Sequence, residues 1–141
     1  MILEQATDVR KEWSSVCDSV IRERPKFIKR TRDKMCLASL DMMKDILAVY
    51  TFTAKHFTEP DGTVTISLDI IDITENGETD EEARSKIGKR ILEYAEEYYQ
   101  NFRIYSISPD KQSHMPYIVK VLIIDDAEEI GRSIICRDVK R

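Results

Sequence analysis

The sequence predicts an α+β protein in which a small helix-hairpin-helix domain precedes a ββαββ-like domain. Apolar residues are spaced mostly at helical steps before residue 50 and alternate with polar residues, as in strands, directly after it. The charge changes at the same place. Residues 1–50 carry ten Lys and Arg against eight Asp and Glu, or +2, whereas residues 51–141 carry twelve against eighteen, or −6. We therefore predict two domains, residues 1–50 and residues 51–141, that face different partners.

Composition indicates a globular protein with an ordinary core. The chain has 141 residues, of which 42% are hydrophobic. It lacks an apolar run long enough to cross a bilayer, and its N-terminus lacks the residue order of a secretory signal. Cys17, Cys36 and Cys136 have neither the spacing of a disulfide framework nor that of a zinc site. We expect a cytoplasmic protein with reduced thiols and no membrane partner.

A first amphipathic helix is predicted over residues 7–22, because apolar residues recur there at three- and four-residue steps. These residues are Val9, Trp13, Val16, Cys17, Val20 and Ile21. Thr7 stands where it can cap the helix, and Asp8 suits the first turn. Pro25 disfavours the α conformation at Arg24, so the chain must continue in an extended form.

A hairpin and a second helix follow. Residues 26–31 and 35–38 are predicted to be its strands and residues 32–34 its turn, although the turn lacks the Gly or Asn that tight hairpins favour. Ser39 can cap a helix over residues 40–49. Because so small a domain has little core of its own, dimerisation would stabilise it.

The second domain is predicted to begin with a hairpin and a long helix. Strands over residues 50–55 and 63–74 are joined by the turn residues Pro60-Asp61-Gly62. Thr79 and Glu82 have the spacing of a capping box, and an apolar face then continues to Phe102.

Two more strands, over residues 103–108 and 117–125, would complete the ββαββ order. After Asp125 the pattern leaves two alternatives open, a short helix or a strand over residues 130–136.

Catalytic constellations are sparse in this sequence. It has only His56 and His114, no Gly-rich phosphate loop, no nucleophile elbow and no paired metal-ligand spacing. We therefore expect no enzymatic activity, no cofactor and no metal. The enzymatic alternative is phosphoester chemistry on a metal bound by the acidic cluster Asp125, Asp126, Glu128 and Glu129.

Positive charge is concentrated in the stretch KFIKRTRDK, residues 26–34, although the chain has a net charge of −4. Arg10 and Lys11 add to it from the first helix. Such a patch can bind phosphate oxygens and, through arginine, base edges of DNA; a solvated charged surface is the alternative. We expect Lys29, Arg32 and Lys34 to contact phosphates and Arg10 and Arg30 to contact bases. The candidate DNA-binding residues are Thr7, Arg10, Lys11, Lys29, Arg30, Arg32 and Lys34.

The segment LEQATDVRKEWSSVCDSVIRERPKFIKRTRDKMCLASLDMMKDILA resembles the N-terminal domain of the Phd/YefM antitoxins. Thr7 matches the capping position of that family, Arg10 its helix arginine and Phe27-Ile28-Lys29-Arg30 its first hairpin strand. Cys36-Leu37-Ala38-Ser39 matches the second strand and the next helix cap. The resemblance implies a dimer that binds operator DNA, represses its own operon and neutralises a toxin, commonly a small ribonuclease.

The sequence departs from that family in two places. Its hairpin turn is shorter and lacks glycine, and residues 51–141 are predicted to fold where the family has a flexible tail. Within them, GETDEEARSKIGKRILEYAEEYYQ resembles the helix of the HicB-like antitoxin domain. A protein-interaction or oligomerisation module that binds no DNA is the alternative function, with the basic hairpin of one copy complementing the acidic domain of another.

Overall fold

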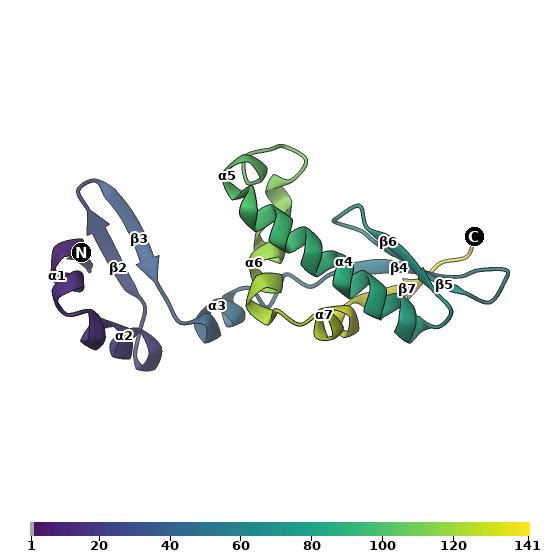
Figure 1. Cartoon of the computed structure of the whole chain (residues 1–141), viewed down its shortest axis with the longest axis horizontal. Helices are drawn as coiled ribbons and strands as arrows, with labels where there is room; N and C mark the ends of the chain where they lie inside the picture. Colours follow the sequence, from purple (N-terminus) through teal and green to yellow (C-terminus); the bar gives the residue numbers. More distant parts are fainter. Residues whose placement is uncertain (1) are drawn as a thin grey trace. The chain divides into compact units, whose positions relative to one another are not determined.

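The computed structural model describes residues 2–141 and divides into two compact units (Figure 1). The first unit ends at Ile46, and the second runs from Leu47 to Arg141. Each unit contains its own sheet and its own cluster of buried apolar side chains. The α+β class predicted from the sequence is confirmed.

The first unit is a three-stranded sheet with helices before and after its hairpin. Its elements are β1 (Leu3–Gln5), α1 (Ala6–Lys11), α2 (Trp13–Arg22), β2 (Lys26–Arg30), β3 (Asp33–Leu37) and α3 (Leu40–Ile46). Strand β2 is central, parallel to β1 and antiparallel to β3. Val9, Val16 and Val20 of the first two helices pack on Ile28 of β2 and form the buried cluster.

The single helix predicted over residues 7–22 is wrong, because Glu12 interrupts it with φ −108° and ψ 30°. The valines of both helices still pack on the sheet, so the apolar face predicted from the spacing is retained on both sides of the break. The capping role predicted for Thr7 is also wrong. Helix α1 follows β1 directly after Gln5, so Thr7 lies inside the helix, and no side chain caps it.

The hairpin turn contains two residues, Thr31 and Arg32, rather than the three predicted, since Arg30 pairs with Asp33. Thr31 has φ 58°, a left-handed conformation uncommon for a β-branched residue. Strand β3 therefore starts earlier than expected. The cap predicted at Ser39 is confirmed by a 3.1 Å hydrogen bond from the Met42 amide to Ser39 Oγ, although α3 ends at Ile46 rather than residue 49.

The second unit is a four-stranded sheet in the order β6-β5-β4-β7, with α4 across one face (Figure 1). Strand β7 is parallel to β4, and the other pairs are antiparallel. Its strands are β4 (Thr53–Thr58), β5 (Val64–Leu68), β6 (Thr74–Gly77) and β7 (Ile135–Asp138). Its helices are α4 (Asp80–Gln100), α5 (Phe102–Tyr105), the 3-10 helix η1 (Gln112–His114), α6 (Met115–Ile124) and α7 (Ala127–Ser133).

Helix α4 forms the centre of this unit, and the predicted cap at Thr79 is confirmed, although the return bond of Glu82 is made to the Glu78 amide rather than to that of Thr79. The Glu82 amide donates to Thr79 Oγ1 at 3.1 Å, and Glu82 Oε2 accepts from the Glu78 amide at 3.3 Å. Its apolar side chains include the fully buried Ile87, Ile91 and Tyr98. Helix α7 packs against α4 where Gly88 meets Gly131, so closely that a Cβ atom on either glycine would collide with the opposite backbone.

The predicted ββαββ order is wrong, since residues 103–108 and 117–125 lie largely in α5 and α6 or in turns rather than in strands. Short apolar, β-branched runs such as the one after Tyr117 fit a buried strand and a buried helix equally well. Pro116 lies in the first turn of α6, a position that favours a helix start. The strand predicted over residues 63–74 ends at Leu68. Beyond Asp125 both open alternatives are realised in succession, as α7 and β7.

Candidate nucleic-acid interface

The hairpin tip, residues 29–34, brings together four of the predicted DNA-binding side chains. Lys29 and Lys34 are directly opposite each other in the β2–β3 register and therefore share one sheet face. That face lies away from α1 and α2, because the neighbouring Ile28 is buried beneath those helices. Arg30 alternates to the helix side, and Arg32 lies in the turn. Like charges directly opposite in a sheet are destabilising, so the Lys29–Lys34 pair costs the hairpin stability.

Arg10 and Lys11 lie in the last turn of α1, both exposed. They therefore lie at the opposite end of α1 from its N-terminal amides. Arg10 lines a hollow of about 520 Å³ together with Trp13 and Met35, on the helix side of the sheet. The candidate residues are thus divided between the two sheet faces.

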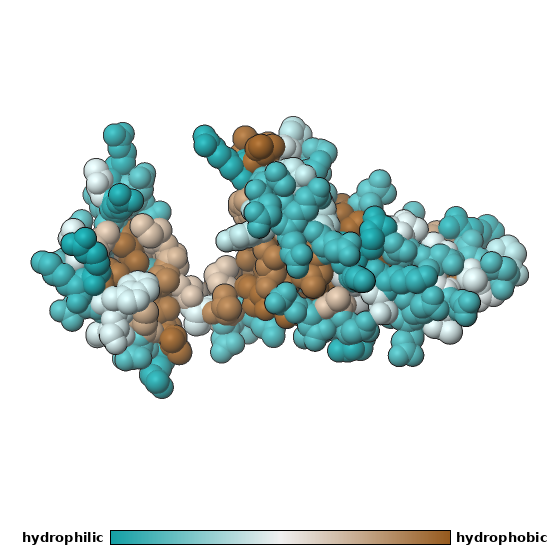
Figure 2. All heavy atoms as spheres, viewed as in Figure 1, coloured by the Kyte–Doolittle hydropathy of each residue, from teal (hydrophilic) through white to brown (hydrophobic). Residues whose placement is uncertain are grey.

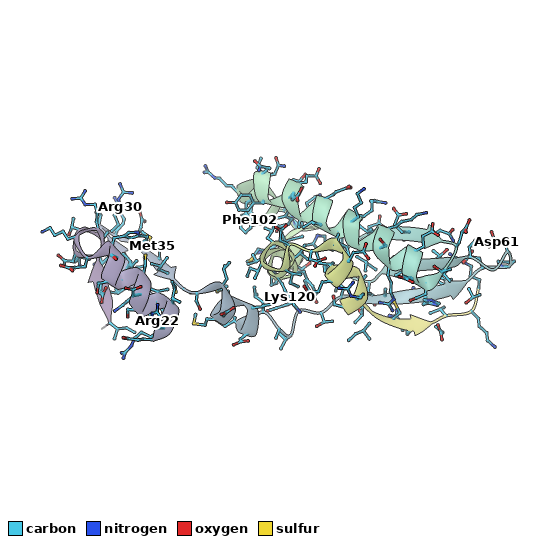
Figure 3. All side chains as sticks on the ribbon, turned by 60° about the horizontal axis from the view of Figure 1, so that its bottom comes forward. Arg22, Arg30, Met35, Asp61, Phe102 and Lys120 are labelled. Atoms are coloured by element: carbon cyan, nitrogen blue, oxygen red, sulfur yellow. The ribbon has the colours of Figure 1, made fainter. Side chains whose placement is uncertain are left out.

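The remaining cations of the basic stretch lie away from the hairpin tip. Figure 3 shows Arg22 and Arg30 at opposite ends of the first unit, with α2 leading to one and β2 to the other. Lys26, at the start of β2, forms a 3.2 Å salt bridge with Glu4. The cations from Arg22 to Lys34 therefore do not form one continuous cluster, because the extended strand β2 separates the two ends of this segment.

Unpaired positive charge distinguishes the first unit. Residues 1–46 contain ten Lys and Arg, and in the described part of the chain only Lys26 of these forms a salt bridge. Five of the eight carboxylates of residues 1–46 line a groove of about 770 Å³ along β1, α1 and α2, together with Arg22 and Lys26. Its acidic residues are Glu4, Asp8, Glu12, Asp18 and Glu23. The unit is therefore electrostatically two-sided, with a cationic hairpin tip and an acidic groove.

Apolar surface flanks the edge strand β3 on both faces. Met35 lines the 520 Å³ hollow on the helix side and a second hollow of about 470 Å³ on the other side, where Phe27 and Cys36 also lie. Trp13 is 52% exposed and Met35 49% exposed. Hydrophobic residues accordingly reach the surface of this unit in Figure 2. The apolar spacing of the first helix predicted that Trp13 is buried, and nothing in the sequence indicated that it would be exposed.

Each of the two histidines contacts side chains from other elements of the second unit. Nε2 of His56 is hydrogen bonded to Asp80 Oδ1 at 3.0 Å, which joins β4 to α4. Nδ1 lies 3.0 Å from Asp138 Oδ1 but without the geometry of a hydrogen bond. His114 Nδ1 is 2.8 Å from the hydroxyl of Tyr94. Burial lowers the pKa of His114 and raises the pKa of Tyr94 to about 12. Both residues of this second pair are therefore uncharged at neutral pH.

The acidic residues considered for a metal have other contacts. Asp125 ends α6 in a left-handed conformation, and Asp126 caps α7 by accepting from the Glu129 amide at 3.1 Å. Glu128 is hydrogen bonded to Ser85. Residues 2–141 contain no group of three or more side chains arranged to hold a metal ion. Over the same residues, every helix is too short or too polar to cross a membrane.

Two comparisons relate this structure to known proteins. The family model PHD_like, described as the antitoxin of a RelE/RelB toxin–antitoxin system, matches residues 1–136. A crystal structure of the antitoxin part of a proposed toxin/antitoxin system from Syntrophomonas wolfei subsp. wolfei is 32% identical in sequence. The match covers 99% of this chain and 100% of that one, with a TM-score of 0.91. No curated protein matches the chain.

Proposed function

The chain belongs to the PHD_like family, the antitoxins of RelE/RelB toxin–antitoxin systems, and we propose that its first unit binds operator DNA as a Phd/YefM-type dimer. Through this binding the protein represses its own operon. Its cognate toxin, the partner that an antitoxin implies, is a ribonuclease neutralised through the HicB-like second unit.

The hairpin tip is the observation that carries the DNA-binding proposal. Lys29 and Lys34 stand side by side without a carboxylate partner in the described chain, next to Arg32. A polyanion would remove the repulsion between the two lysines and release counterions from its own phosphates. Arg30 and Arg10, on the helix side, are the candidates for base contacts. The acidic groove along α1 and α2 would repel DNA, so the hairpin tip is the side that approaches it.

The hollows beside Met35 support the dimer. The buried cluster of the first unit contains only four residues, Val9, Val16, Val20 and Ile28. A second copy seated against β3 would cover Met35 and Trp13 and pair the exposed strand edge. A two-fold dimer would then present two hairpin tips to one operator.

Fluorescence anisotropy with the DNA directly upstream of its own gene, against a scrambled duplex at two salt concentrations, tests this function. If a dimer neutralises about four to six phosphates, log K should fall against log salt with a slope of roughly −4 to −5. Arg10→Ala should relax the sequence preference at a cost of about 1–3 kcal/mol. A slope near zero would contradict DNA binding. Self-association lost at high salt, without duplex binding, would support the interaction-module alternative instead.

A further inference from the structure

The second unit contains a cleft of about 680 Å³ between α4, the β5–β6 connection and the segment around η1. Its floor is apolar and is formed by Ile70, Ile71 and Ile73. Ile70 remains 42% exposed, so the floor is open to a partner. The charged side chains that line it are Asp72, Arg90, Glu93, Glu97, Asp110 and Lys111.

The two cations of the cleft are already neutralised. Arg90 is bound to Glu75 at 2.7 Å, and Lys111 to Asp110 at 3.1 Å. Within residues 2–141, Asp72, Glu93 and Glu97 form no salt bridge at all. Glu93 and Glu97 are one turn apart on α4, a spacing at which like charges repel. The cleft therefore carries uncompensated negative charge above an apolar floor.

The wall of the cleft adds no positive charge. Tyr94 and His114 face each other there, hydrogen bonded at 2.8 Å. Burial keeps the pKa of His114 below its usual value, so its ring is neutral at neutral pH. The pKa of Tyr94 is raised to about 12, chiefly by burial, with smaller contributions that include Glu97 and Asp110. A cation bound here would meet carboxylates and neutral aromatic groups.

We propose that this cleft binds an arginine-bearing segment of the cognate toxin. The aliphatic stem of the arginine would lie on Ile70, and its guanidinium would bridge Glu93 and Glu97. A planar guanidinium can bind two carboxylates at once while its stem covers apolar surface, which the compact ammonium of lysine does less well. This inference rests on the proposed toxin neutralisation and assigns it a site.

Charge complementarity selects this occupant. DNA is excluded by the unpaired carboxylates. The cationic hairpin tip of a second copy is the competing occupant, and the experiment distinguishes it from the toxin.

The test uses the full-length chain and the protein encoded by the adjacent gene, with binding followed by isothermal titration calorimetry at two salt concentrations. The variant Glu93→Gln/Glu97→Gln removes two charges from the cleft. The control variant Glu81→Gln/Glu96→Gln removes two charges from exposed positions of the same helix outside the cleft. We expect the cleft variant to bind about tenfold more weakly or worse and with a smaller salt dependence, and the control to stay within about twofold of wild type. Ile70→Ser should weaken binding without changing the salt dependence.

Each of the other outcomes would overturn the proposal that the cleft binds the toxin, and each can be told apart from the rest. The cleft variant relieves a repulsion and should unfold at or above the wild-type temperature, so weaker binding would not report a loss of fold. Equal weakening by both double variants would assign the effect to net charge, and unchanged binding by both would leave toxin binding intact but place it elsewhere. If sedimentation without the toxin shows that only the cleft variant loses self-association, a second copy is the occupant. Failure of the wild type to bind would overturn both the cleft and the proposed toxin neutralisation.

Discussion

The two units of this antitoxin differ in the size of their buried cores and in the share of their charged side chains that form salt bridges. The second unit has a core of sixteen buried residues, and six of its twelve Lys and Arg side chains form salt bridges. The first unit buries a cluster of four and leaves most of its cations and several large apolar side chains exposed. The second unit can therefore fold on its own contacts. The first unit leaves an apolar surface beside β3 and a cationic hairpin tip uncovered, the two surfaces to which we assign the proposed dimer contact and the proposed DNA contact.

The largest effect should come from breaking the core of the second unit with Gly88→Val. The new Cβ atom would meet the Ala127 carbonyl oxygen and the backbone of Gly131, which cannot move aside without separating α4 from α7. We expect a loss of about 3 kcal/mol or more, confined to the unfolding transition of the second unit in urea followed by circular dichroism.

Gly62→Ala is the control for that substitution. Gly62 has φ 86°, but a Cβ atom there would meet open space, so only the backbone conformation is strained, at about 1–2 kcal/mol. Equal losses in the two variants would show that the approach of α4 to α7 is not what holds the unit together.

The next effect concerns the assembly of the first unit. Met35→Asp places a charge between the two hollows beside β3 and should convert the proposed dimer to a monomer. The unfolding midpoint of the first unit would then no longer rise with protein concentration, and operator affinity would fall about ten- to a hundredfold through loss of the second hairpin tip. Sedimentation and anisotropy measure both. Ile135→Asp, at a 61% exposed position of the second unit, should change neither.

A smaller difference is expected in the pH dependence of the two units. The pKa of His114 is lowered by burial from 6.5, so the unfolded chain takes up this proton before the folded one. The contribution of the neutral His114 ring to the free energy of unfolding is fully present above about pH 6.5 and is lost as the pH falls below that value. Between pH 7 and 5.5 the unfolding midpoint of the second unit should therefore fall more in the wild type than in His114→Gln, a comparison in which His56 is present in both proteins. The first unit contains no histidine, so its midpoint should stay level over this range.

The smallest effect has opposite signs on stability and on binding. Lys34→Glu replaces the repulsion with Lys29 by an attraction and should stabilise the first unit by about 0.5 kcal/mol. The same change should weaken duplex binding at least tenfold and make the salt slope shallower. Arg24→Glu changes the charge equally, away from the hairpin tip, and should leave most of the affinity intact. A loss of stability in Lys34→Glu would contradict the cost assigned to the lysine pair.

Features that depend on neighbouring residues could be predicted from the sequence. The caps at Ser39 and Thr79 and the long helix α4 follow from side chains within one turn of the backbone they bind, and they formed as predicted. The change of spacing near residue 50 indicated an α+β protein, and the order of residues in the first third indicated an antitoxin. The comparisons confirm the antitoxin.

Features that depend on residues distant in the sequence became evident from the three-dimensional structure. The apolar run from Tyr117 to Ile124 became helix α6 because it packs against α4, and its composition alone fitted a strand equally well. The basic stretch was divided by the length of β2, and Trp13 stayed exposed beside the buried cluster of Val9, Val16, Val20 and Ile28. The physical reason is the range of the interactions. A cap is satisfied within a few residues, whereas burial and the grouping of charges require the whole chain to be in place.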